Sequence, residues 1–167
     1  SLVKEATGGA VAAFELMPAN GVRLAVEHLP HARNPLESET PWMVLIELVS
    51  GEEGRAETLM ETALEKGFEA GLVTDGAIAQ AEAQAQDFWA LREGIPEAEK
   101  AHGKAAKHDV SVPVSRMADF MAEATKKAES MVEDAMVIAF GHVGDGNVHF
   151  NLARKTAGAD EAFLEAA

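Results

Sequence analysis

Two histidines near the end of the chain, His142 and His149, lie in the segment GHVGDGNVHFN. The dipeptide Asp145-Gly146 inside this segment is a strong β-hairpin signal, because a tight turn needs positive φ at both central positions. With the turn there, or in a four-residue loop at 144–147, His142 directly faces His149. Cβ atoms of such a pair are roughly 4.5–5.5 Å apart on one face of the sheet. Two imidazoles at that separation could share one metal ion.

Other side chains of the segment help to weigh this interpretation. The spacing of two histidines is weak evidence by itself, because paired histidines are often ordinary half-buried residues. The opposite hairpin face is apolar, and a hairpin buried on both faces makes an imidazole costly without a polar partner. Asn151 lies on the same face as His149. Asp145 could be a further ligand, but a turn aspartate more often bonds its own backbone.

The chain is acidic, with 167 residues and a formal net charge of −14. Nucleic-acid binding is excluded, because phosphate contacts need a basic face. An acidic domain that binds an anionic substrate must gather its few cations in one place. The chain has no cysteine, so neither a disulfide nor a thiolate site is expected.

Residues 1–167 are expected to form a single domain that is a fragment of a larger protein. The sequence shows no signal peptide and no apolar run long enough to span a bilayer. We therefore expect a cytoplasmic protein, which could be peripheral to a membrane only through other parts of the parent protein.

Hydrophobic periodicity and turn residues predict alternating strands and helices. The expected strands are 11–17, 42–49, 72–74, 107–112, 135–142 and 147–152. The expected helices are 20–27 capped by Asn20, 56–67, 77–92 ended by Gly94 and Pro96, and 116–131 capped by Ser115. This order predicts an α+β, ferredoxin-like fold, with a largely antiparallel sheet and helices packed on one face.

Three blocks of the chain, in order, resemble one known family. They are FWALREGI at 88–95, KHDVSVP at 107–113, and the hairpin segment at 141–151. The chain resembles the C-terminal substrate domain of FAD-linked oxidases that act on 2-hydroxy acids, which include D-lactate, D-2-hydroxyglutarate and glycolate-type dehydrogenases and oxidases. This resemblance implies that FAD sits mainly on an N-terminal domain absent from the chain, and that hydride passes from C2 of the substrate to the flavin.

The resemblance also implies roles for the two histidines. His142 and His149 would bind a divalent metal, zinc or manganese. The third ligand, a glutamate, and the histidine that accepts the substrate proton belong to a later E-H-G motif. Both would lie beyond residue 167, so no catalytic base is expected in this chain.

Substrate-binding roles follow in the same way for Arg92, Lys107 and Asn151. Arg92 and Lys107 match cations that hold substrate carboxylates, and Asn151 matches an asparagine that lines the active site. Taken from sequence alone, Arg92 could be a last-turn arginine that complements a helix dipole, and Lys107 could form a surface ion pair with Asp109. Some members carry a hydroxyl residue where this chain has Pro96, which favours an acid smaller than 2-hydroxyglutarate or differently shaped.

We therefore expect the substrate- and metal-binding domain of an FAD-dependent D-2-hydroxy acid dehydrogenase or oxidase, inactive without its flavin domain. Its partners would be a small 2-hydroxy acid and that FAD domain; the electron acceptor is not indicated. The alternative is a stand-alone ferredoxin-like module that binds a metal or a small acid without catalysis. Metal-assisted hydrolysis ranks last, because the hairpin offers no base except the turn residue Asp145.

Overall fold

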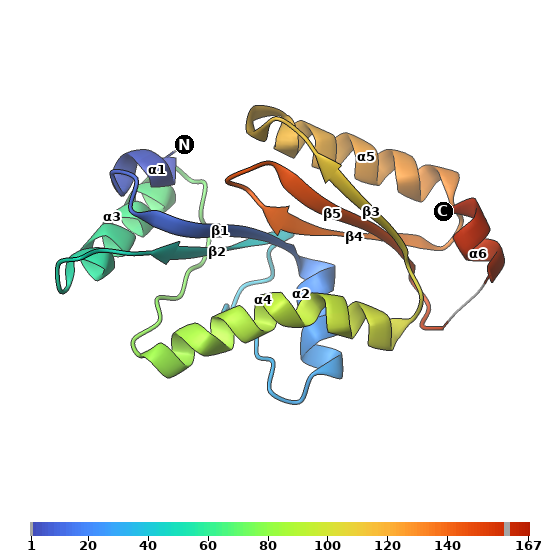
Figure 1. The fold of residues 1–167 in the computed structure, drawn as a ribbon, viewed down its shortest axis with the longest axis horizontal. Coiled ribbons are helices and arrows are strands. Elements are labelled where there is room, and N and C mark those ends of the chain that lie inside the picture. Colours follow the sequence, from blue (N-terminus) through green and yellow to red (C-terminus); the bar gives the residue numbers. More distant parts are fainter. Residues whose placement is uncertain (1, 159–160) are drawn as a thin grey trace.

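The computed structural model describes residues 2–158 and 161–167. The strands are β1 (Val11–Pro18), β2 (Trp42–Leu48), β3 (Ala106–Ser111), β4 (Ala135–His142) and β5 (Asn147–Arg154). The helices are α1 (Leu2–Ala6), α2 (Ala19–His28), α3 (Arg55–Glu69), α4 (Glu82–His102), α5 (Met117–Met131) and α6 (Glu161–Ala166), with a 3-10 turn η1 (Val114–Arg116) before α5. Figure 1 shows the arrangement of these elements.

The strands form one sheet in the order β2-β1-β4-β5-β3, and every neighbouring pair is antiparallel. The predicted α+β class with an antiparallel sheet is thus confirmed. β4 occupies the centre of the sheet, and residues 135–141 along it are all buried. A strand buried on both sides needs a covering layer on each face of the sheet.

Helices accordingly cover both faces, which corrects the prediction of helices on one face alone. Met136 and Ile138 of β4 share a core with α2 and α4. Val137 and Ala139, which alternate with them, pack in a second core with α5. Figure 1 shows α2 and α4 on one side of the sheet and α5 on the other. The sequence order of the elements does not specify which face each helix covers.

Helix α4 runs without interruption from Glu82 to His102, although the sequence predicted a break at Gly94 and Pro96. A proline inside a helix costs about 3 kcal/mol. Here the helix buries Leu91 and Ile95, and this packing outweighs the cost. Gly94 allows α4 to approach the end of α2 closely, because a Cβ there would lie 2.3 Å from Leu29 Cδ1.

Several predicted boundaries differ from the observed ones. Residues 72–74 form no strand; Val73 packs against Gly67, where an added Cβ would lie 2.7 Å from its side chain. α3 therefore continues through Gly67 to Glu69. Asn20 lies inside α2 and is no cap, because its Nδ2 donates to the Val137 carbonyl at 2.7 Å. Ser115 lies within η1 and makes no cap hydrogen bond.

The β4–β5 hairpin has a different register from the predicted one. His142 faces Asn147 and His149 faces Phe140, so the two histidines are diagonal neighbours on one face and not a directly opposed pair. The register differs by two residues, which preserves the face because side chains alternate with period two. The expectation of Cβ atoms 4.5–5.5 Å apart is therefore wrong, and diagonal positions are roughly 7–8 Å apart.

The neighbouring strands explain this register. The connection is a four-residue loop at 143–146. Val143 N donates to the Phe14 carbonyl at 2.9 Å, and Val112 N donates to the Gly146 carbonyl at 3.0 Å. Positive φ occurs at Gly146 but not at Asp145, so the tight turn with two positive φ values does not form. The backbone of this loop is held from both sides by β1 and by the end of β3.

Candidate functional site

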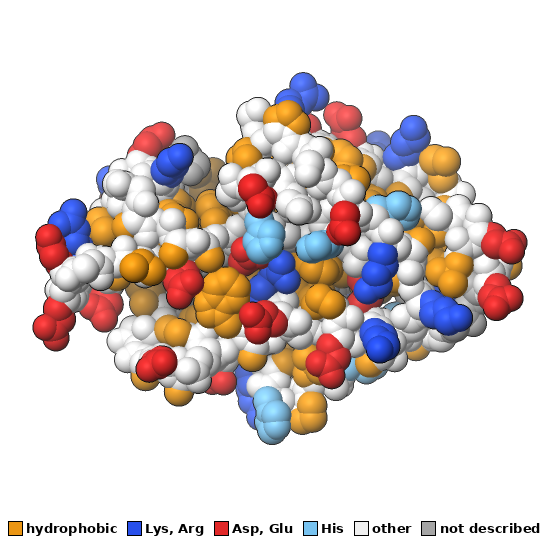
Figure 2. All heavy atoms as spheres, in the orientation of Figure 1, with side chains coloured by type: hydrophobic (Ala, Val, Ile, Leu, Met, Phe, Trp, Pro, Cys, Tyr) orange, Lys and Arg blue, Asp and Glu red, His pale blue; other side chains and the backbone are white. Residues whose placement is uncertain are grey.

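Polar side chains from five elements gather on the face of the sheet that α4 covers in part. The pairing of β1, β3, β4 and β5 places their members of this set on one face of the sheet. They are Glu15 of β1, Lys107 and Asp109 of β3, His142 of β4, His149 and Asn151 of β5, and Arg92 and Glu99 of α4. Figure 2 shows histidine, basic and acidic side chains side by side in the middle of the molecular face that it displays.

Glu15 connects the first histidine to Arg92. It lies directly across the β1–β4 pairing from His142, and its Oε1 is 2.5 Å from His142 Nδ1. Its Oε2 accepts from Arg92 Nε at 3.1 Å and Nη2 at 2.9 Å. The Glu15 and Arg92 side chains are only 3% and 9% exposed. A carboxylate accepts hydrogen bonds, so His142 Nδ1 is the donor, and in the neutral tautomer Nε2 then keeps its lone pair.

The second histidine has a carboxylate partner of its own. Asp109 faces His149 across the β3–β5 pairing, and its Oδ1 is 2.5 Å from His149 Nδ1. By the same reasoning His149 Nδ1 is the donor, and Nε2 keeps a lone pair in the neutral tautomer. A carboxylate on one imidazole nitrogen, with the other nitrogen free, is the arrangement that orients metal-binding histidines in proteins.

The two histidines therefore offer two nitrogen donors of the kind that divalent metal sites use. Within residues 2–158 and 161–167, however, no group of three or more histidine, cysteine, aspartate or glutamate side chains could hold a metal ion. Asp145 takes the turn role, because its Oδ1 accepts from Asn147 N at 2.9 Å. Metal binding by His142 and His149 stays a prediction.

A second buried carboxylate organises the other predicted substrate-binding residues. Glu99, which is completely buried, contacts Lys107 Nζ at 2.8 Å through Oε1 and accepts from Asn151 Nδ2 at 2.8 Å through Oε2. Lys107 faces Asn151 across the β3–β5 pairing. The alternative ion pair between Lys107 and Asp109 does not form, since Lys107 pairs with Glu99 and Asp109 with His149.

Arg92 lies in the middle of α4 and not in its last turn, so the helix-dipole interpretation of this residue is wrong. The Arg92 guanidinium lies over the Phe140 ring, with Cζ 4.9 Å from the ring centroid. The Phe140 ring also contacts His149, with ring centroids 5.0 Å apart. Glu15 occupies the Nε–Nη2 edge of the guanidinium, so a substrate carboxylate could only reach the Nη1 side.

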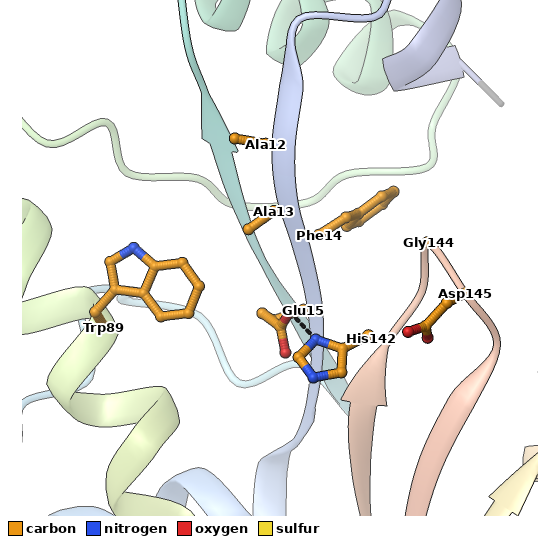
Figure 3. Close-up of a pocket in the computed structure, with 8 residues that line it drawn as sticks. All are labelled: Ala12, Ala13, Phe14, Glu15, Trp89, His142, Gly144 and Asp145. Atoms are coloured by element: carbon orange, nitrogen blue, oxygen red, sulfur yellow. Dashed lines mark hydrogen bonds and ion pairs between the residues drawn. The ribbon is translucent and has the colours of Figure 1, made fainter.

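A hollow of about 380 Å³ lies beside the Glu15–His142 pair and is lined by Trp89 and Asp145 among others. Figure 3 shows the Trp89 ring and the Glu15–His142 pair around this space. Small-molecule sites in proteins begin at about 300 Å³, and this hollow is slightly above that size. Trp89 is half-buried.

The charges of the site do not by themselves favour an anion. Two cations, Arg92 and Lys107, stand against three carboxylates, Glu15, Glu99 and Asp109, which leaves a formal charge of −1 with neutral histidines. The expected gathering of cations is thus present, but each cation is paired with a buried carboxylate. A divalent cation held by the histidines would change the sign of this charge to positive.

Sequence reasoning missed the roles of Glu15, Glu99 and Asp109. Glu15 is the one charged residue of the apolar strand VAAFELMP, and a lone charge on a buried strand signals a required partner. Glu99 follows Arg92 by seven residues, two helical turns along the same face. Asp109 was considered only as a partner of Lys107.

No helix among the described residues combines the length and apolarity that crossing a membrane requires. Residues 1–166 match the family described as FAD linked oxidases, C-terminal domain. The chain is similar to the D-2-hydroxyglutarate dehydrogenase of Xanthomonas citri pv. viticola, with 40% identity over 85% of the chain and 30% of that protein. It is also similar to the mitochondrial D-2-hydroxyglutarate dehydrogenase of Arabidopsis thaliana, with 37% identity over 90% of the chain and 26% of that protein. For the mitochondrial D-2-hydroxyglutarate dehydrogenase of Rattus norvegicus, the identity is 36% over 87% of the chain and 26% of that protein.

The chain thus spans between a quarter and a third of the length of these relatives. Two of the three relatives carry the word mitochondrial in their names. The cytoplasmic location expected from the sequence stays a prediction.

Proposed function

The chain belongs to the family of C-terminal domains of FAD-linked oxidases, and on that premise we propose that it is the substrate- and metal-binding domain of an FAD-dependent D-2-hydroxy acid dehydrogenase. The parent enzyme would oxidise C2 of the substrate and pass hydride to the flavin on another domain. The single observation that supports this best is the pair of carboxylate-bound histidines. Their Nε2 atoms have no hydrogen-bond partner among the described residues, they share one sheet face, and two cations lie beside them.

His142 and His149 would hold the divalent metal, zinc or manganese, with further ligands from the parent chain. When bound, such a metal polarises the 2-hydroxyl group of a chelated substrate and fixes its C2 against the flavin. Each histidine has a carboxylate partner at Nδ1 that helps to orient its imidazole. Imidazole and carboxylate ligands suit both zinc and manganese.

The other residues of the site would bind and orient the substrate anion. Lys107 is the more accessible of the two cations of the site, with a side chain that is 57% exposed and an ammonium that forms an ion pair with Glu99. Arg92 would contribute from its Nη1 side. Asn151 uses Nδ2 for Glu99, which leaves its carbonyl oxygen to accept from a substrate hydroxyl.

The relatives are named for D-2-hydroxyglutarate, which carries a second carboxylate. In this chain Pro96 offers no side-chain hydroxyl one turn after Arg92, so a distal carboxylate would have one donor fewer. We propose a D-2-hydroxy acid as the substrate class. A comparison of kcat/KM for D-lactate, D-glycerate, D-malate and D-2-hydroxyglutarate on the full-length parent would identify the preferred acid.

The metal assignment is tested by elemental analysis of the full-length parent purified without chelator. We expect the wild type to contain close to one divalent metal, and His142→Ala and His149→Ala each to lose it together with activity. His108→Ala is the matched control, because His108 lies on β3 with its ring bonded to the Phe150 carbonyl, on the other face of the sheet. Equal metal content in all four proteins would refute the assignment. Metal binding without oxidation of any acid would favour the stand-alone binding module.

A further inference from the structure

We propose that Glu15 is a positioning residue that couples the metal-binding histidine to the carboxylate-binding arginine. This inference rests on the proposed function, because it assigns a role to the partner of His142. One carboxylate oxygen of Glu15 faces the imidazole and the other faces the guanidinium. A shift of this side chain would displace both partners together.

The backbone holds Glu15 firmly in this place. Glu15 and His142 are directly opposed across the β1–β4 ladder, and on its other side Glu15 is paired with Leu45 of β2. Its side chain is 3% exposed, so water cannot replace either partner. At a buried position the effective dielectric constant is low, so each of these charge-assisted hydrogen bonds is stronger than it would be in water.

The double contact requires a carboxylate. Two oxygens that both accept can serve two donors, whereas the amide of a glutamine has one accepting oxygen and one donating nitrogen. In a Glu15→Gln variant either Arg92 or His142 loses its acceptor. If the amide nitrogen faces His142, the imidazole must present Nδ1 as an acceptor. Its proton then moves to Nε2, the atom that would bind the metal.

Glu99 provides a matched comparison within the same site. It is equally buried and also contacts a cation and a second polar side chain, Lys107 and Asn151. No contact joins it to either histidine among the interactions described above. A Glu99→Gln change therefore also removes one buried negative charge and affects the substrate contacts, while His142 keeps Glu15 as its partner.

The experiment uses the full-length parent as wild type, Glu15→Gln, Glu15→Asp, Glu99→Gln and His142→Ala. Zinc affinity is measured by competition with a chromophoric chelator, and the kcat and KM are measured with the preferred acid. We expect Glu15→Gln to lower zinc affinity about 10–100-fold, as loss of such a second partner does elsewhere, and to raise KM. Glu15→Asp should recover part of the affinity, and Glu99→Gln should raise KM with zinc affinity within about threefold of the wild type.

A direct measurement of the histidine tautomer covers the case in which Glu15→Gln folds poorly. Nitrogen NMR of the wild type at neutral pH should show His142 with its proton on Nδ1, identified by the signal that His142→Ala loses. A wild-type His142 protonated on Nε2 alone would overturn the proposal. So would a folded Glu15→Gln protein with the zinc affinity of Glu99→Gln. If the proposed metal site itself is wrong, the result differs from these two outcomes, because the wild type would then bind no more zinc than His142→Ala.

Discussion

The two histidine–carboxylate pairs of the site have the same contact distance and very different surroundings. His142 and Glu15 meet at 2.5 Å, with a Glu15 side chain that is 3% exposed. His149 and Asp109 also meet at 2.5 Å, but the Asp109 side chain is 77% exposed. The first pair continues into Arg92, whereas Asp109 lies in solvent at the edge strand β3.

The two pairs therefore have the same contact distance but are expected to differ in their contribution to stability. An exposed charged pair contributes about 0–1 kcal/mol, because water competes for both partners and salt screens them. A buried ionic network is costly to desolvate, and breaking it by removing one partner costs far more than the exposed contact contributes. We therefore infer that the Glu15 pair governs both stability and metal affinity at this site, while the Asp109 pair only adjusts the orientation of His149.

The largest effect is expected for Arg92→Met. The change leaves the buried Glu15 carboxylate with His142 as its one partner among the contacts described here, and removing one partner of a buried pair typically costs about 3–5 kcal/mol. Urea denaturation measures the loss. The double variant Arg92→Met/Glu15→Gln should be more stable than Arg92→Met, because the unpaired charge is gone. A loss below about 1 kcal/mol in Arg92→Met would remove the distinction between the two pairs.

A smaller effect is expected for Lys107→Met, because here an exposed cation faces a buried anion. Lys107 is 57% exposed and Glu99 is not exposed at all. Leaving a buried acceptor without its partner costs about 1–3 kcal/mol, and we expect a loss of that size together with a raised KM. Glu99→Gln combined with Lys107→Met should restore stability but not KM. Recovery of KM in that double variant would show that Lys107 acts only through Glu99.

The exposed pair itself should tolerate substitution. Asp109→Asn keeps the size of the side chain, and we expect the free energy of unfolding to change by less than about 1 kcal/mol. Zinc affinity of the full-length parent should fall less than it does in Glu15→Gln. Raising the salt concentration should weaken the effect of Asp109→Asn and leave that of Arg92→Met nearly unchanged, because buried pairs are screened much less. Equal zinc losses in Asp109→Asn and Glu15→Gln would show that burial does not distinguish them.

The sequence could predict the features of the hairpin that depend on alternation along a single strand. The arms of the hairpin and the common face of His142 and His149 follow from alternation along a strand, and both are present in the structure. The register was mispredicted, because the bonds from Phe14 and Val112 that hold the loop come from strands distant in sequence. Local turn chemistry at Asp145-Gly146 could not include them.

The partners of the predicted residues depend still more on tertiary structure. Arg92 and Lys107 could be selected by their resemblance to a family pattern, but their pairing with Glu15 and Glu99 needs the packing of α4 on the sheet. The low helix propensities of Gly94 and Pro96 predicted an end within α4 that the structure does not have. Burial of Leu91 and Ile95 outweighs that local preference, and the continuous helix is what brings Glu99 to the site.

The smallest effect is expected at the other end of the hairpin, where Asp134 binds the side chains of Arg154, the last residue of β5, and of Thr156. Thr156 Oγ1 donates to Asp134 Oδ2 at 2.8 Å and Arg154 Nε donates at 3.0 Å. These hydrogen bonds, first that of Thr156, hold the pKa of Asp134 below its usual value of 3.8. A lowered pKa in the folded state stabilises the protein above pH 3.8, and the contribution is lost as the pH falls through the folded value.

Asp134→Asn tests this contribution with little backbone strain, because Asp134 has φ of 63° and asparagine tolerates that region. We expect the Tm of the variant to lie below that of the wild type at pH 6, and the two values to converge as the pH falls below 3.8. The Asp134–Arg154 ion pair should resemble the Asp109 pair and differ from the Glu15 pair, because its loss should have a small effect that salt reduces. A Tm difference that stays constant down to pH 2 would mean that the carboxylate charge contributes nothing there.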